Sequence, residues 1–544
     1  MTLLELPQEL LLAIASFLEA ERDINSLSRT NTQLHALLNP YLYRQNARTS
    51  NSSALLWAAV HGRENTARFS LQCGANIAAF DPRGFTPLMI ACQLGHVGVV
   101  ELLAAQDDVN LNGSISDWFP PDPNVPQHRR PHQYMSPLLF AVESNRVDVV
   151  KFLLDHPGVN LHFADCKGWS AVHHATKDGC EAVLNLLLGD DRTRALVDGS
   201  LVTFAHDMKR YSAVSVMLGT DGLELDLYPE EADALLNGSL DMGFPHIVKS
   251  LLMLASPLTE SRCLYEWKSP LASAVVHGDK GAVVSLLPDP TVDASYGDIA
   301  LGLPPLSLAV CMENAEIVHL LLAADRVDPN IQDDAGRSPL WIAASLGYAR
   351  IAQLLLEKDG IDVNLKTKGN ETPLTIASER GDATLIRLLL AHDNIELDTE
   401  CDKGWSTLGA AVTHGHHEVA ELLLKTEGVD PNRRRGGPPL WTAVRNDDLA
   451  MVDLLLATDG VDPNAIGDIL GTHALSQAVS QGNADIVHRF LRRDDVDINC
   501  IDQLGQTPLD STEEEGMVEV LRAKGAMRGE ELRARQRGSD RRLF

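Results

Sequence analysis

The chain of 544 residues carries a formal net charge of −29 at pH 7, which disfavours non-specific binding to nucleic acid or anionic membranes, since both need a basic surface. Its residues are 44% hydrophobic and only 5% aromatic, which suits closely packed small helices better than a β-sandwich. The length alone suggests about three or four ordinary domains, unless the chain is a repeat array.

The first predicted element is the apolar segment 6–18, LPQELLLAIASFL, which has no counterpart later in the chain. It is similar to the apolar region of a signal peptide. However, no Lys or Arg precedes it, and Glu5, Pro7 and Glu9 interrupt it. No uninterrupted apolar run reaches the ~18 residues that a membrane helix needs. The segment is therefore interpreted as a cap or a docking module, and no membrane association is expected.

Residues 6–43 are predicted to form three short helices. The first runs from about Pro7 to Leu18, the second from about Ile24 to Ser28, and the third from about Gln33 to Leu38, ended by Asn39-Pro40. The apolar residues of the first helix spread over a broad arc, so this helix should bury more than one face. About 40 residues alone make a marginal domain, so the segment needs a neighbour, either the following repeats or another chain.

The same segment carries an ordered set of landmarks: Leu6-Pro7, Glu9-Leu10, Ile14, Phe17-Leu18, Leu27, Leu34, Leu37 and Pro40. In order and spacing they resemble an F-box, of the kind fused to ankyrin arrays in fungal proteins. The resemblance implies docking onto a Skp-type adaptor, which joins a cullin–RING ubiquitin ligase. By position, five residues would make this contact: Leu6, Pro7, Leu11, Leu18 and Leu27. The alternative is that these leucines only cap the repeats.

After residue 50 one unit recurs, as in TPLMIACQLGHVGVVELL at 86–103 and SPLWIAASLGYARIAQLL at 338–355. Most steps between units are 32–35 residues, and the units near 195–255 are degenerate. Aligned on the Leu of TPL, the anchors are Leu55, Leu88, Leu138, Val172, Val202, Leu236, Leu271, Leu306, Leu340, Leu374, Leu408, Leu440, Leu475 and Leu509.

The sequence of each unit predicts two helices and a turn. Thr or Ser before Pro, as in Thr86-Pro87, is typical of a helix N-cap. The proline then takes the first helical position, where its missing backbone N–H costs no hydrogen bond. Ala91 allows close approach of helices, and Gly95 is a left-handed C-cap. An apolar second helix follows, and Asp-x-x-Gly, as in Asp81 to Gly84, closes a tight β-turn.

These units resemble the ankyrin repeat over residues 51–525. The resemblance implies an all-α fold: a three-helix F-box over 1–46, then a solenoid of about 14 helix pairs with β-turn fingers on one side. The polar residues 512–515 fit a terminal cap, and 526–544 would form a basic tail. That tail could be a weak nuclear or nucleic-acid patch, or a solvated end. The Pro-rich insertion 113–133 would be a disordered excursion or a flap over the groove.

Partner contacts in ankyrin arrays use the finger tips and the inner face of the first helices. The residue between the turn Gly and the Thr or Ser is expected to be exposed, and here it is Phe85, Trp169 or Trp405. Trp341 and Trp441 follow the anchor Leu. Since Trp is a favoured interface anchor, these residues are candidate partner contacts. The alternative is that each ring packs on a neighbouring finger.

Basic residues on three consecutive predicted fingers form a second candidate site. Together they would make a local positive strip that binds an acidic or phosphorylated peptide. The alternative is that they are solvated finger tips. The residues are Lys366, Lys368, Lys403, Arg433, Arg434 and Arg435.

No catalytic motif was found: a Walker loop, a nucleophile elbow, H-E-x-x-H and a kinase signature are all missing. The eight cysteines are scattered without a C-x-x-C pair, which favours a reduced intracellular compartment over disulfides or zinc. HGHH at 414–417 suggests a metal, but Gly415 occupies the C-cap position of a surface turn. We therefore expect neither an enzyme nor a cofactor.

Two functions remain from this sequence. The first is a substrate-recognition subunit of a Skp–cullin–F-box ubiquitin ligase, with the array holding a target protein. The second is a non-catalytic scaffold whose N-terminal helices only cap the solenoid. For either, we expect a cytoplasmic or nuclear protein, monomeric apart from its complex, that does not bind nucleic acid.

Overall fold

A computed structural model describes residues 32–49, 52–114, 135–220, 223, 227, 229–254, 269–295, 302–433, 437–467 and 471–540. These residues confirm the all-α prediction: they contain helices and turns, and their only β-pairing is one isolated bridge between Ile466 and His473. The chain divides into two compact units between Tyr228 and Pro229, and each unit is described by itself.

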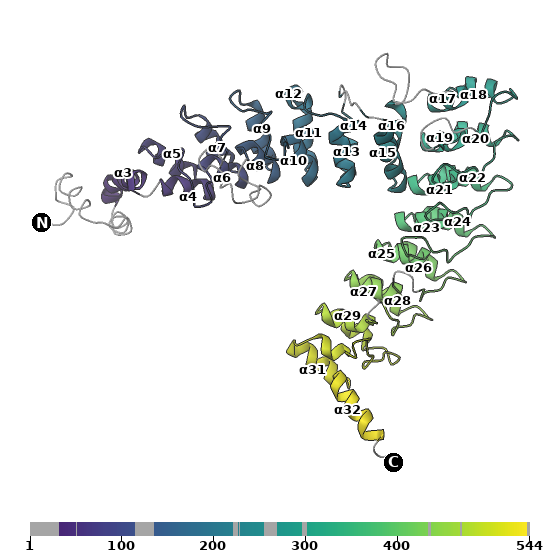
Figure 1. Ribbon diagram of the computed structural model, residues 1–544. Coiled ribbons are helices and arrows are strands. Elements are labelled where there is room, and N and C mark those ends of the chain that lie inside the picture. Colours follow the sequence, from purple (N-terminus) through teal and green to yellow (C-terminus); the bar gives the residue numbers. More distant parts are fainter. Residues whose placement is uncertain are drawn as a thin grey trace. The chain divides into compact units, whose positions relative to one another are not determined.

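The first unit consists of α3 followed by antiparallel helix pairs, with the short α12 beside the fourth pair (Figure 1). Its first helices pack on one another in sequence order, and so do its second helices. The elements are α3 (Thr32–Thr49), α4 (Ser53–His61), α5 (Glu64–Gln72), α6 (Pro87–Leu94), α7 (Val97–Ala104), α8 (Pro137–Glu143), α9 (Val147–Asp155), α10 (Ala171–Asp178), α11 (Glu181–Gly189), α12 (Asp191–Arg194), α13 (Gly199–Asp207) and α14 (Tyr211–Leu218).

The second unit repeats the same pairing from α17 to α30, with loops that project to one side of the stack (Figure 1). Its elements are α15 (Pro229–Asp241), α16 (Pro245–Leu254), α17 (Pro270–Val276), α18 (Lys280–Leu286), α19 (Pro305–Cys311), α20 (Ala315–Leu322), α21 (Pro339–Leu346), α22 (Ala349–Leu356), α23 (Pro373–Arg380), α24 (Ala383–Leu390), α25 (Thr407–Thr413), α26 (His417–Leu424), α27 (Pro439–Arg445), α28 (Leu449–Leu456), α29 (Ala474–Ser480), α30 (Ala484–Phe490), the 3₁₀-helix η5 (Pro508–Ser511), α31 (Glu515–Ala523) and α32 (Gly529–Asp540).

The local chemistry of the unit is as predicted. Thr86 Oγ1 accepts a hydrogen bond from the Met89 N–H at 3.3 Å, and Pro87 opens α6. Gly95 ends the helix with φ 82°, a left-handed conformation that costs glycine little. Between helices, Ile317 and Leu321 of α20 are fully buried. Each such side chain contributes about 1.5–3 kcal/mol of transfer free energy, so stacking supplies most of the stability.

An asparagine ladder joins successive fingers of the second unit. Asn330 accepts a hydrogen bond from the Asp362 N–H at 2.8 Å and donates one to the Gly360 carbonyl at 2.8 Å. Asn364, Asn432, Asn464 and Asn499 repeat this pair of contacts. A side-chain amide suits the position because it accepts and donates at once.

The third predicted helix does not end at Asn39-Pro40, because α3 continues through Pro40 to Thr49. A proline inside a helix removes one backbone hydrogen bond. Contacts with the first repeat offset that loss: Tyr43 packs edge-on against Phe69 at 5.0 Å, and Asn46 Oδ1 accepts from the Ala54 N–H at 2.9 Å. The end of the N-terminal module is thus continuous with the array.

The region predicted as a basic tail is partly folded. The Gly529 N–H, at the start of α32, donates to Asp510 at 2.8 Å, and Thr507 Oγ1 donates to the Met527 carbonyl at 2.8 Å. Arg522 and Glu531 form an ion pair at 2.7 Å. The contacts of Met527, Gly529 and Glu531 therefore join the start of this region to the last repeat.

Candidate interaction surfaces

The segment predicted to bind an adaptor lies mostly outside the described residues. Five candidate contacts fall there, and their role stays a prediction: Leu6, Pro7, Leu11, Leu18 and Leu27. The described end of the module is α3, in which Leu34 and Leu38 are buried. Because α3 packs on α4 and α5, this end of the module is built into the first repeat.

Phe85, expected to be exposed, is buried. Its side chain is only 6% exposed, and its ring lies 5.0 Å from that of Phe140 in the next ankyrin-like repeat. The finger stacks so closely on the following first helix that a large apolar side chain in this position is covered. The expectation of exposure is wrong for Phe85, which contributes to the core between successive repeats.

Trp169 and Trp405 occupy the same position in later fingers and are partly exposed. The Trp169 ring lies 5.3 Å from Phe204, and Lys167 Nζ lies 4.3 Å above it. The Trp405 ring lies edge-on to His414 at 5.1 Å. Each ring therefore rests on a neighbouring element and keeps an accessible part, so a role as partner contact stays a prediction for both.

Trp341 and Trp441 are core residues. Their exposed fractions are 0% and 7%. A Cβ atom added at Gly467 would come within 2.0 Å of the Trp441 ring, so the chain backbone presses directly on this indole. The prediction of an accessible contact is wrong for both residues, and the loop at Gly467 covers Trp441.

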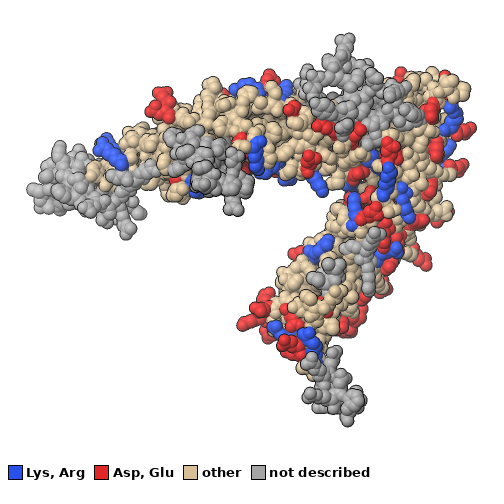
Figure 2. Space-filling view, viewed as in Figure 1, with Lys and Arg blue, Asp and Glu red and all other residues tan. Residues whose placement is uncertain are grey.

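Of the four predicted strip cations that the structure describes, three are paired with carboxylates. Lys366 pairs with Glu396 at 3.3 Å and Arg433 with Glu400 at 2.9 Å, beside a groove of about 440 Å³ that also contains Asp398. Lys and Arg are interspersed with Asp and Glu over this unit (Figure 2). Lys368 is exposed and makes no ion pair with a described residue. Arg434 and Arg435 lie outside the described residues.

Lys403 forms the densest charge cluster of the strip. Its Nζ lies 2.9 Å from carboxylate oxygens of both Glu371 and Glu379, whose side chains are 12% and 7% exposed. Burial raises the pKa of Glu371, against the opposing effect of Lys403. Burial also acts to lower the pKa of Lys403, but its bonds to the two carboxylates together hold that pKa above its usual value. The Lys403 side chain is 42% exposed, but its ammonium group is paired with two largely buried carboxylates.

Arg337 was missed by the sequence analysis. Its side chain is 1% exposed, and its Nε donates to Asp333 at 2.7 Å. Its Nη1 and Nη2 donate to Asp241 at 3.0 Å and Asn237 at 2.8 Å, both on α15. The signal was available, since Arg337 stands between a turn glycine and Ser338, the position that Phe85 holds in its own finger.

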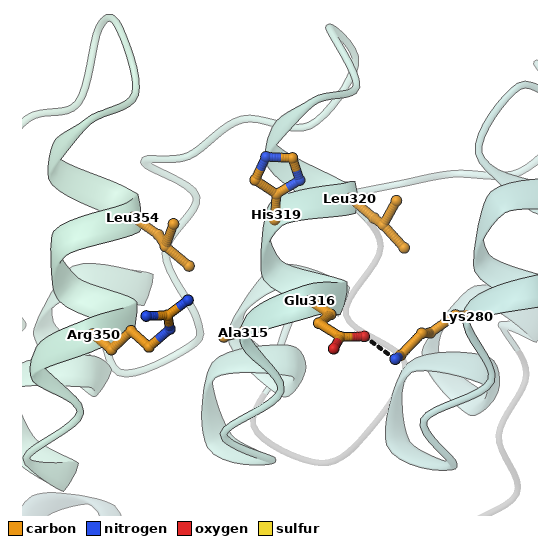
Figure 3. A pocket seen from close by; sticks show the side chains of 7 residues that line it. All are labelled: Lys280, Ala315, Glu316, His319, Leu320, Arg350 and Leu354. Atoms are coloured by element: carbon orange, nitrogen blue, oxygen red, sulfur yellow. Dashed lines mark ion pairs between the residues drawn. The ribbon is translucent and has the colours of Figure 1, made fainter.

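A shallow groove of about 420 Å³ crosses the second helices α18, α20 and α22 (Figure 3). Leu320 and Leu354 supply its apolar lining, and Lys280 is paired with Glu316 across it. Arg350 has no carboxylate partner among the described residues. Sequence analysis gave no sign of this groove, because its residues lie on the outer helices.

The histidines at 414–417 are engaged within the fold. His416 Nε2 lies 2.9 Å from the Glu379 carbonyl, and His417 Nε2 lies 2.9 Å from Asp448. Within the described ranges, no cluster of three or more His, Cys, Asp or Glu residues could hold a metal ion. None of the helices in those ranges has the length and apolarity to cross a membrane.

Comparison with protein families matches two descriptions. Ankyrin repeats in three copies match residues 27–113, 117–195, 243–367, 360–435 and 440–526, which together cover most of the chain. The description F-box-like matches residues 3–49.

Single proteins give partial matches. Rabankyrin-5 of Homo sapiens is 26% identical over 159 residues, which are 26% of this chain and 14% of that protein, so the chain spans only a small part of this relative. Among solved structures, the ankyrin repeat domain of Bcl-3, a member of the IkappaB protein family, is 27% identical with a TM-score of 0.38, over 40% of this chain and 97% of that one. The human ASB11 ankyrin repeat domain is 25% identical with a TM-score of 0.34, over 41% and 98%.

Proposed function

The chain belongs to the ankyrin-repeat family and carries an F-box-like module at residues 3–49, and from this premise we propose that it is the substrate-recognition subunit of a Skp–cullin–F-box ubiquitin ligase. The module would bind a Skp-type adaptor, and the array would bind a target protein. The adaptor contacts in this proposal are Leu6, Pro7, Leu11, Leu18 and Leu27.

The observation that carries the proposal is the F-box-like match over residues 3–49, and the physical junction between the module and the array supports it. α3 belongs to the F-box-like match and is also packed on α4 and α5 of the first repeat. Asn46 Nδ2 donates to Ser53 Oγ at 2.6 Å, so a side chain of the module is tied to the first helix of the array. This direct packing of α3 on the first repeat would limit how far a target held by these repeats turns relative to the adaptor.

The proposed mechanism is proximity, and the chain would take no part in the chemistry. A target held on the array would present its lysines to the conjugating enzyme at an effective concentration on the order of mM, as for short tethers. Trp169 and Trp405 support target binding best among the predicted residues, because they keep accessible ring surface. Such a complex would act in the cytoplasm or the nucleus.

The proposal is tested by purifying the intact chain and a Leu6→Ala/Pro7→Ala form from cells and measuring the recovered Skp-type adaptor and cullin. The matched control is Ile501→Ala/Leu504→Ala, which removes two apolar side chains that are 56% and 64% exposed. We expect recovery from the intact chain and the control, and loss from the first variant. Equal recovery from all three, or from none, would count against the ligase.

The second candidate, a scaffold with a helical cap, is favoured by the burial of Leu34 and Leu38 at the junction with the repeats. A cap needs such burial and no adaptor. Under this function the Leu6→Ala/Pro7→Ala chain would lose stability but would recover the same partners as the intact chain. The same purification, combined with a thermal unfolding curve, therefore separates the two candidates.

A further inference from the structure

The α15–α16 hairpin departs from the stacking order of its unit. α15 packs on α21, although α17, α18, α19 and α20 lie between them in the sequence (Figure 1). First helices such as α21 form the inner face of the stack, the face that ankyrin arrays use for partners. All eight residues of α21 are buried, whereas Gly409 and Thr413 of the equivalent α25 remain partly exposed. The hairpin therefore covers part of the inner face.

One side of α15 carries the groups that Arg337 recognises. Asn237 and Asp241 are four residues apart, so they lie on one face of the helix, and each accepts one hydrogen bond from the guanidinium. Asp333 holds the third side of the same group. Three fixed acceptors around a planar guanidinium are a specific arrangement, not incidental packing.

The carboxyl end of α15 is recognised separately. The Leu240 carbonyl accepts a hydrogen bond from Ser345 Oγ at 2.5 Å, and the Asp241 carbonyl accepts one from Arg380. Both carbonyls lie in the last turn of α15, where the Leu240 carbonyl also accepts from the Gly243 N–H at 3.2 Å, and the negative end of the helix dipole favours a cation. Burial lowers the pKa of Arg380, in keeping with a cation enclosed at this contact.

Gly243 makes the approach possible. A Cβ atom there would lie 2.4 Å from the Ser345 carbonyl oxygen and 2.7 Å from Arg380 Nε. The second helix of the hairpin adds one contact, in which Lys249 pairs with Glu313 at 2.6 Å and lies 5.5 Å over the Tyr348 ring. The named contacts are polar, and polar contacts of this kind specify geometry more than they add stability.

We propose that Arg337, Ser345 and Arg380 form a receptor for the carboxyl end of a helix that carries an amide or carboxylate one turn before that end, and that α15 is its resident, displaceable occupant. While α15 is seated, the inner face at α21 and α23 is closed to other proteins. A partner helix with the same end chemistry would compete for it. The proposal does not rest on the ligase assignment.

The first test uses hydrogen–deuterium exchange of the full chain and a matched pair of glycines. Gly243 and Gly278 both have φ 69°, but a Cβ atom at Gly278 meets only Asn314 Nδ2, at 3.7 Å. In Gly243→Ala, we expect residues 229–254 to exchange at least about tenfold faster while α22 to α30 keep their protection. In Gly278→Ala, exchange of 229–254 should match that of the unmodified chain.

Two outcomes would overturn the displaceable hairpin. One is equal exchange of 229–254 in both variants. The other is a joint loss of protection by 229–254 and by α19 to α24, because the hairpin would then be an integral layer of the core.

The second test addresses the chemistry of the occupant. A labelled peptide with the sequence of residues 229–254 is titrated against the Gly243→Ala chain, beside the same peptide with Asp241→Lys. We expect the first peptide to bind more tightly, and to bind the unmodified chain more weakly than the variant because its site is filled. Equal binding of both peptides, or binding of neither, would overturn the receptor.

Discussion

Asp398 accepts a hydrogen bond from the backbone N–H of Asp430 at 3.0 Å through Oδ2, while its other oxygen is buried without a donor among the described residues. It stands where the neighbouring fingers have asparagine. By register with Asn330 and Asn364, an asparagine amide at this position would reach the carbonyl of Gly428. One link of the ladder is thus half made.

Asp398→Asn should therefore stabilise the protein. It supplies the missing donor, and a hydrogen bond of this kind contributes about 1 kcal/mol. The matched reverse change is Asn432→Asp, which removes the donor from an intact link and should lower stability by a similar amount. Urea unfolding of the three chains measures both effects. A lower urea midpoint for Asp398→Asn would contradict the ladder.

The benefit of Asp398→Asn should depend on pH. Burial raises the pKa of Asp398 above its usual value, against the opposing effects of the Asp430 N–H and Arg433. A raised folded-state pKa means that the protonated form is favoured by folding, so stability is lost as pH rises through that pKa. We expect the difference between the two chains to grow from about pH 4, near the ordinary Asp value, to pH 7. A stability difference between the two chains that stays constant or shrinks over this pH range would contradict the raised pKa of Asp398.

Lys403→Met should destabilise the second unit. The change leaves Glu371 and Glu379 without their cation, and both are largely buried. Breaking a fully buried pair costs about 3–5 kcal/mol, and the partial exposure of Lys403 reduces our expectation to roughly 1–2 kcal/mol. Lys368→Met is the control and should change stability by less than about 0.5 kcal/mol. Thermal unfolding measures the stability of both variants. An equal loss of stability in Lys403→Met and Lys368→Met would refute the role of Lys403 as the partner of the two buried carboxylates.

Gly467→Ala should be strongly destabilising. The added methyl group would meet the Trp441 ring at 2.0 Å, so either the indole or the finger must move, at a cost of about 1–3 kcal/mol. Gly516→Ala, where nothing lies within 4 Å, should be neutral or slightly stabilising. Trp fluorescence during urea unfolding follows both changes. An unchanged midpoint for Gly467→Ala would show that Trp441 is not held as described.

Local patterns made most of the fold predictable from the sequence. The Ser or Thr before Pro, the left-handed glycine and the Asp-x-x-Gly turn each have a short-range physical cause, so they placed the helix ends in most units. The course of α3 through Pro40 was not predictable in this way. Its cause is tertiary contact of Tyr43 and Asn46 with residues further along the chain.

The candidate sites were less predictable, because exposure depends on what covers a finger. Phe85 and Trp441 stand at positions where the sequence pattern predicts accessible residues. In the structure both are buried by the neighbouring repeat. The carboxylates of Glu379 and Glu371, which neutralise Lys403, lie 24 and 32 residues earlier, in the preceding repeat. Arg337 is covered by a helix about 100 residues away. No periodicity in a linear repeat indicates such a return of the chain.

The proposed ligase role is tested most directly by measuring the affinity of the purified, folded chain for a purified Skp-type adaptor by calorimetric titration. We predict a one-to-one complex with a Kd on the order of 1 μM or tighter, weakened at least about tenfold by Leu6→Ala/Pro7→Ala and unchanged by Ile501→Ala/Leu504→Ala. An intact chain that is folded and shows no binding, or equal binding by the intact chain and the Leu6→Ala/Pro7→Ala form, would contradict the proposed function.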